Sequence, residues 1–192
     1  MNKLIKYIFT RFIFFILIAF TAFGCNHMNT TPPNNIEMVN LLIKPDDMPS
    51  GWIVEFPAGP FHAAEYEEEA EKIVFVPERG IRRSTGQNIY RYEDAREARY
   101  YLRKLNPEVL GRGEFVPEGW IQPVLSADEE EFICYWKADN PAEKYLFCYW
   151  IARYGEYIVD FVTWVLPDLM SLEQIRTLII KIDSKMVSAL NN

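Results

Sequence analysis

The sequence contains few of the residues that metal sites and nucleophilic sites require. It has two histidines and three cysteines, and only one of the histidines, His62, lies within residues 37–192. Structural zinc takes four cysteine or histidine ligands, so no zinc or other metal site is expected. The sequence also lacks a Gly-rich phosphate loop, a His-Glu-x-x-His pair and a Gly-x-Ser-x-Gly elbow. We therefore expect no cofactor and a protein that is not an enzyme.

A basic stripe is also missing from the chain. Lys and Arg number 20 against 27 Asp and Glu, which gives a formal net charge of −7. Nucleic-acid backbones bind clustered positive charge, so no nucleic acid is expected as a partner. Two acidic stretches, residues 65–71 and 128–131, lack the Asp-x-Asp-x-Asp-Gly spacing of a calcium loop. We interpret both stretches as solvated surface.

The longest apolar run is too short to span a membrane as a helix. Lys3, Lys6 and Arg11 precede an apolar run over residues 12–23, whereas a spanning helix needs about 20 residues. A positive segment followed by a short apolar run is typical of a secretory signal peptide.

The run ends at Ala22-Phe23-Gly24-Cys25, which resembles the lipobox of bacterial lipoproteins. The resemblance implies a diacylglyceryl thioether on Cys25, cleavage after Gly24 and acylation of the new amino group, for example with palmitate. Two or three acyl chains anchor a protein stably. The lipid would then be the link to the cell membrane or the outer membrane, on its extracytoplasmic face. The alternative is an ordinary signal peptide or an uncleaved anchor with an incidental cysteine.

This interpretation divides the chain into three parts. Residues 1–24 are the expected lipoprotein signal peptide, and residues 25–36 the lipidated cysteine and a flexible tether rich in Asn, Thr and Pro. Residues 37–192 have the length of a single domain.

The expected fold class is α+β. Strand-like runs cover residues 72–77 and 87–92, and a helical pattern over 93–105 has Asp94 as its N-cap and Asn106-Pro107 as its stop. Three β-rich runs over 131–138, 144–153 and 156–165 predict a C-terminal antiparallel meander. A long amphipathic helix over 171–190 begins with a Ser171–Gln174 capping box. We expect the antiparallel sheet to pack against both helices.

The tripeptide Cys-Tyr-Trp occurs twice in the meander, at Cys134 and at Cys148. Alternate residues of a strand share a face, and the charged residues nearby favour an inward position for both cysteines and for Trp136 and Trp150. The register that keeps these faces sets Cys134 opposite Cys148, at a spacing that suits a disulfide. A type I turn at Asn140-Pro141 favours a register one residue away. A disulfide and two reduced core cysteines both remain open.

The opposite face of the meander is too apolar for ordinary solvated surface. Either a helix covers it, or it is an interaction surface. Its candidate contact residues are Tyr135, Phe147, Tyr149 and Trp164.

The order of "LLIKPDDMPSGW", "QNIYRYEDAREARYYL" and "IARYGEYIVDFV" resembles small uncharacterised bacterial lipoproteins, which are similar to the Mog1/PsbP-like α+β fold. The resemblance implies no catalytic residues. We expect a lipid-anchored extracytoplasmic, non-catalytic binding or interaction module at the cell envelope, with an envelope protein as partner. The alternative is a small-ligand receptor or hydrolase with a pocket between sheet and helices. A deep polar pocket near His62 would favour that alternative.

Overall fold

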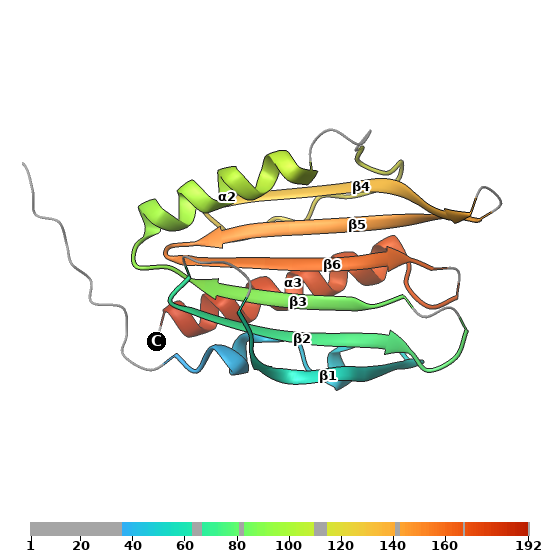
Figure 1. Cartoon of the computed structure of the whole chain (residues 1–192), viewed down its shortest axis with the longest axis horizontal. Helices are drawn as coiled ribbons and strands as arrows, with labels where there is room; N and C mark the ends of the chain where they lie inside the picture. The colour runs from blue at the N-terminus through green and yellow to red at the C-terminus, as the bar shows by residue number, and fades with distance from the viewer. Residues whose placement is uncertain are drawn as a thin grey trace, which may run out of the picture. The chain divides into compact units, whose positions relative to one another are not determined.

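A six-stranded antiparallel sheet forms the centre of the fold (Figure 1). The computed structural model describes residues 36–62, 67–80, 83–109, 115–140, 143–166 and 168–191. The predicted signal peptide, the tether up to residue 35 and the predicted lipidation site Cys25 lie outside these residues. The strands, in the spatial order β1-β2-β3-β6-β5-β4, are β1 (Trp52–Pro60), β2 (Glu69–Pro77), β3 (Thr85–Arg91), β6 (Tyr157–Val165), β5 (Glu143–Tyr154) and β4 (Glu129–Asn140).

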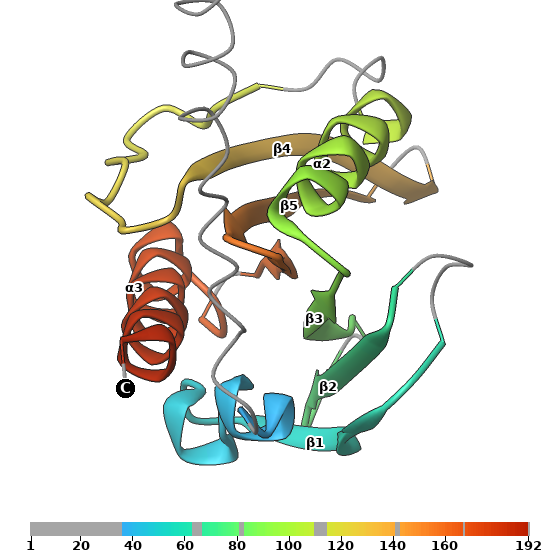
Figure 2. The ribbon, with the colours of Figure 1, turned by 90° about the vertical axis from the view of Figure 1, so that its left-hand side faces the viewer.

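Helices lie on both faces of the sheet, as Figure 2 shows. The face that we call inner carries α3 (Leu172–Leu190) and two short 3-10 helices, η1 (Met38–Leu41) and η2 (Pro45–Asp47). The outer face carries α2 (Ala95–Val109). The α+β class, the antiparallel sheet and the C-terminal helix are therefore confirmed.

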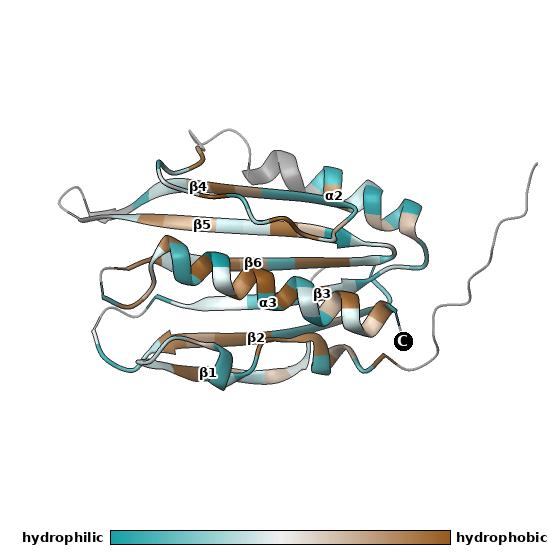
Figure 3. Ribbon diagram, turned by 180° about the vertical axis from the view of Figure 1, so that it is seen from behind, coloured by the Kyte–Doolittle hydropathy of each residue, from teal (hydrophilic) through white to brown (hydrophobic). Residues whose placement is uncertain are grey.

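The C-terminal helix begins where its capping box predicts. The Oγ atom of Ser171 accepts a hydrogen bond from the Gln174 amide at 3.2 Å, and the Gln174 side chain accepts one from the Ser171 amide at 2.7 Å. Figure 3 shows α3 crossing in front of β6 and β3. Its buried apolar residues are Ile175, Leu178, Ile179, Ile182 and Met186. Within the described part of the chain, no helix is long and apolar enough to cross a membrane.

The outer helix starts as predicted but ends later. The carboxylate of Asp94 accepts a hydrogen bond from the Glu97 amide at 2.8 Å, which confirms Asp94 as the N-cap. The predicted stop at Asn106-Pro107 is wrong, because α2 continues to Val109. Pro107 lies in the last turn of the helix, where it lacks the backbone donor that would bond to the carbonyl of residue 103.

Two strands in the N-terminal half were missed or shortened by sequence reasoning. No strand was expected at β1, and the second strand was expected from residue 72, whereas β2 begins at Glu69. The pairing of β1 with β2 is shifted twice, between Val54 and Phe56 and again before Gly59. An irregular edge strand does not show the strict alternation that identifies a strand in sequence.

The predicted meander is confirmed in part. Strands β4, β5 and β6 pair in the expected order, with Trp150 opposite Phe161 and Tyr154 opposite Tyr157. The third strand also pairs with β3, so the meander is one half of a larger sheet.

Both competing registers of the β4–β5 hairpin occur in the structure. Cys134 lies opposite Cys148, whereas Asn140 lies opposite Glu143, which is one residue out of step. A register shift between Ala138 and Asn140 absorbs the difference. The register that pairs the cysteines and the register one residue away therefore occur in the same hairpin, on either side of a bulge.

Candidate functional site

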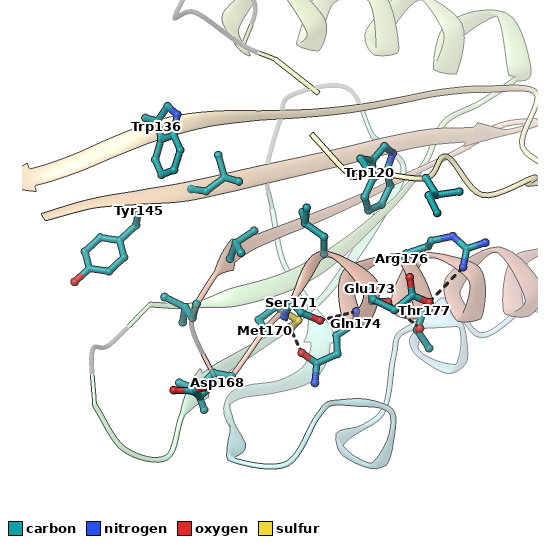
Figure 4. Close-up of a pocket in the computed structure, with 17 residues that line it drawn as sticks. Trp120, Trp136, Tyr145, Asp168, Met170, Ser171, Glu173, Gln174, Arg176 and Thr177 are labelled. Atoms are coloured by element: carbon teal, nitrogen blue, oxygen red, sulfur yellow. Dashed lines mark hydrogen bonds and ion pairs between the residues drawn. The ribbon is translucent and has the colours of Figure 1, made fainter. Parts of the chain in front are cut away.

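An open groove lies on the inner face, at the end of the sheet where the β4–β5 hairpin reaches past the start of α3 (Figure 4). Its volume is about 1030 Å³, which is large enough for a drug-sized ligand or for side chains of a partner. The apolar lining comes from the sheet, from the turn before β4 and from the segment that joins β6 to α3. Its main members are Trp120, Ile121, Trp136, Leu146, Val165, Leu166, Met170 and Leu172.

Trp120 closes one end of the groove, and a buried carboxylate holds the segment that follows it. The Trp120 ring stacks on Phe132 of β4, with ring centroids 3.7 Å apart and planes inclined by 12°. Further along, Asp183 of α3 accepts hydrogen bonds from the Ser126 amide at 2.9 Å and the Tyr154 hydroxyl at 2.8 Å. The segment before β4 is therefore tied both to the sheet and to α3.

Trp136 stands at the other end of the groove and is exposed. We predicted both tryptophans of the repeated tripeptide to be inside, and for Trp136 this is wrong, because 60% of its surface is accessible. Trp150 is 1% exposed, as predicted. The difference arises because β4 is an edge strand and its tip extends beyond α3, so the inward face there has no helix over it. Phe115 alone among the described aromatic residues stacks against Trp136, at 6.2 Å.

The two cysteines of the repeat lie two residues away along the chain from Trp136 and Leu146, which line the groove. Their sulfur atoms are 2.03 Å apart and their Cα atoms 4.1 Å apart, at disulfide distance. Both are fully buried in the inner core, which confirms the predicted face. The pair joins the edge strand β4 to β5 immediately beside Trp136.

The polar side chains at the groove rim bind one another. Glu173 forms an exposed ion pair with Arg176 at 3.4 Å, and the Thr177 hydroxyl donates to the Glu173 carbonyl at 2.9 Å. Ser171 and Gln174 form the cap of α3. Among the described residues that line the groove there is no histidine or cysteine. The groove therefore offers a large apolar floor, and several of the polar groups at its rim are bonded within α3.

The predicted interaction surface on the outer face is mostly closed. Tyr135, Phe147 and Trp164 form a row across three strands, with ring centroids 5.2 Å and 4.9 Å apart. Lys137 lies over the Trp164 ring at 5.3 Å and Arg83 lies over it at 4.8 Å. Because these cations cover the row, Trp164 is only 6% exposed. The row is an aromatic packing unit with a cationic cover.

Tyr149, the fourth residue predicted for that surface, belongs to a different cluster. It packs beside Ile151 and Ile158, which α2 covers with Ala98 and Leu102. Of the two alternatives for the outer face, cover by a helix therefore occurs in this part of the sheet. The four predicted residues do not form one open surface.

A buried carboxylate lies close to the α2 cluster. Asp160 of β6 is 5% exposed and accepts hydrogen bonds from Asn88 at 2.7 Å and from the Tyr90 hydroxyl at 3.0 Å. Burial raises the pKa of Asp160 to about 6, although the hydrogen bonds from Asn88 and Tyr90 favour its charged form. Asp160 had no sequence signal of its own, because its burial depends on partners from β3.

The acidic stretches do not form a metal site in the described residues. Near His62 there is a hollow of about 270 Å³, much smaller than the groove. Asp128 and Glu129 pair with the buried Arg153, at 2.9 Å and 3.2 Å. No group of three potential metal ligands occurs in the described part of the chain. Residues 128–131 are therefore partly an ion-pair network and not simply solvated surface.

The groove is a candidate site that sequence reasoning missed. The exposure of Trp136 depends on where α3 begins relative to the hairpin tip, and Trp120 lies in a segment without periodicity, so neither had a local signal. The repeated tripeptide was the only sequence signal for this region, because it places a tryptophan near the end of an edge strand. No protein-family model, no curated protein and no solved structure matches this chain.

Proposed function

We propose that the protein is a lipid-anchored extracytoplasmic binding module that holds an apolar part of an envelope protein in its groove. The observation that carries the proposal is the 60% exposed Trp136 beside an apolar floor. Large exposed apolar patches mark binding sites more often than inert surface, and tryptophan is enriched among the residues that dominate interface energetics.

The proposed compartment rests on two features. The lipobox-like Ala22-Phe23-Gly24-Cys25 would place the domain outside the cytoplasm on a lipid anchor. The cysteine pair at disulfide distance supports export, because disulfides persist mainly in oxidising compartments. The membrane would be the cell membrane or the outer membrane.

The composition of the groove favours binding over catalysis. A hydrolase needs a nucleophile and a base within hydrogen-bond reach of each other. In the groove, Ser171 is engaged in the helix cap, and the Thr177 hydroxyl donates to a backbone carbonyl. The second candidate is a receptor for a small apolar ligand, which the groove volume of about 1030 Å³ would accommodate.

Site-specific photo-crosslinking in the native envelope tests the groove. A photoreactive phenylalanine analogue would replace Trp136, and the control would carry it at Phe56, which is exposed on β1. We expect a discrete protein adduct from position 136 and none from position 56. The adduct should disappear when Leu146→Glu places a charge in the groove floor. Equal adducts at both positions, or none at 136, would contradict the proposal.

The anchor is tested separately. Cells expressing the full chain would be fed an alkyne-labelled fatty acid, and we expect the label on the protein and its loss in Cys25→Ser. Retention of the label in this variant would refute lipidation at Cys25, whereas the groove proposal would stand.

A further inference from the structure

We infer that the groove accepts a basic amphipathic helix of a partner protein. The inference rests on the proposed function of the groove and names the chemistry of its occupant. The partner helix would lay an apolar face between the two tryptophans and direct lysines or arginines toward the rim.

The spacing of the tryptophans suits two turns of a helix. Trp120 stacks on Phe132, and Trp136 lies four residues further along the same strand. Four strand residues span about 13 Å. Residues i and i+7 of a helix are about 10 Å apart along its axis, so one apolar stripe of two turns fits between the tryptophans.

The polar groups of the groove disfavour a polar ligand such as a saccharide. A saccharide needs several hydrogen-bond partners that converge on its hydroxyls, whereas Ser171 and Thr177 already bond within α3 and Glu173 pairs with Arg176. The floor consists of aliphatic side chains from β5, β6 and the segment before α3. An apolar helix face leaves no polar group unpaired on such a floor.

Charge complementarity selects a basic helix. Asp168 and Glu173 line the groove, and exposed Glu118 is next to Gly119, which also lines it. The one cationic group among the described lining residues is Arg176, which already pairs with Glu173. The whole chain carries a formal net charge of −7. Complementary charge at the rim would steer a basic helix toward the groove.

The groove lies at the opposite end of α3 from η1, near which the described residues begin. The carbonyl of Leu42, just after η1, accepts a hydrogen bond from Lys185 in the last part of α3 at 2.6 Å, whereas the groove lies at the first turns of α3. In Figure 1 the end of β4 and η1, which is drawn in blue, lie at opposite ends of the sheet. The first described residues are therefore not part of the groove.

Peptide titration of the full-length protein in neutral detergent tests the inference. The probes are an 18-residue amphipathic peptide of Leu and Lys with a fluorescent label, and the matched peptide of Leu and Glu. By fluorescence anisotropy in low salt we expect the Lys peptide to bind at least about tenfold more tightly. Trp136→Ala should weaken its binding about tenfold or more, because truncating a central tryptophan commonly costs that much.

Matched variants distinguish the effect of charges at the groove from the effect of the protein's overall negative charge on peptide binding. Glu118→Gln with Glu173→Gln should weaken binding of the Lys peptide about threefold to tenfold. Glu55→Gln with Glu156→Gln removes the same amount of charge outside the groove and should leave the affinity for the Lys peptide unchanged. Phe56→Ala should leave this affinity unchanged as well. Equal loss in both charge pairs, or equal affinity for both peptides, overturns the inference. If crosslinking at position 136 still succeeds, only the class of partner is wrong.

Discussion

Cys134 is held on both sides of its strand, by Cys148 and by Phe115. Its sulfur lies 2.03 Å from that of Cys148 on β5, and its backbone amide and carbonyl both bond to Phe115, each at 2.9 Å. An edge strand has otherwise only one neighbour to hold it. Cys134, two residues before Trp136, therefore ties β4 both to β5 and to the segment at Phe115.

Replacing both cysteines should weaken the fold measurably. For Cys134→Ala with Cys148→Ala we expect the free energy of unfolding to fall by about 3 kcal/mol, since the cysteines are 14 residues apart and a loop of that length gives about this value. Urea denaturation with and without reductant measures the difference. Reductant should have no effect on the double variant. Full thiol labelling of both cysteines in unreduced, denatured protein would show that the bond does not form.

The two tryptophans of the repeated tripeptide should respond differently to truncation. Trp150→Ala should lower the unfolding free energy by about 3–5 kcal/mol, because it opens a cavity in the core. Trp136→Ala should change it by less than about 1 kcal/mol, because the side chain is mostly in solvent. Thermal unfolding of each variant gives the comparison. Similar losses in the two variants would contradict the exposed position of Trp136.

Asp160 should make stability depend on pH in a defined direction. Its pKa is about 6 in the fold against 3.8 for an unperturbed carboxyl, so the native state holds the proton more tightly than the unfolded chain. Its contribution is therefore most favourable below about pH 4 and is lost as the pH rises through about 6. We expect the stability of the wild type relative to Asp160→Asn to fall by about 3 kcal/mol across this interval.

The control for that measurement is Val124→Ala. Val124 is fully exposed, and its replacement adds or removes no titratable group. The stability difference between this variant and the wild type should stay flat between pH 4 and 7. A flat difference for Asp160→Asn as well would show that Asp160 titrates like an exposed carboxyl.

The segment before β4 should loosen when its carboxylate partner is removed. Asp183→Ala leaves the Ser126 amide and the Tyr154 hydroxyl without their acceptor, so we expect a loss of about 1–3 kcal/mol. Hydrogen exchange at the Ser126 amide should accelerate strongly. Ser184→Ala, on the exposed side of α3, is the control and should leave that exchange rate unchanged. Unaltered protection in Asp183→Ala would contradict this role.

The elements that sequence predicted well are those whose signals are local. Ser171 and Gln174 mark the start of α3, and strict alternation around the cysteines determined the register of β4 and β5. Asp94 likewise marked the start of α2. Each of these features depends on residues within a few positions of one another.

The elements that were missed depend on contacts between distant segments. The exposure of Trp136 depends on the length of β4 relative to α3, and the closure over Trp164 depends on Arg83, about 80 residues earlier in the chain. The burial of Asp160 requires Asn88 and Tyr90 of β3. Strand β1 has a shifted pairing without alternation. None of these relationships leaves a short-range pattern.

The bulge between Ala138 and Asn140 allows the pairing register at the tip of the hairpin to differ by one residue from the register at the cysteines. Because it absorbs a one-residue mismatch, the connection at the tip could be lengthened or exchanged without moving Cys134 away from Cys148. The hairpin tip is therefore a natural place to graft a reporter sequence or a longer loop, with the groove beneath it kept intact.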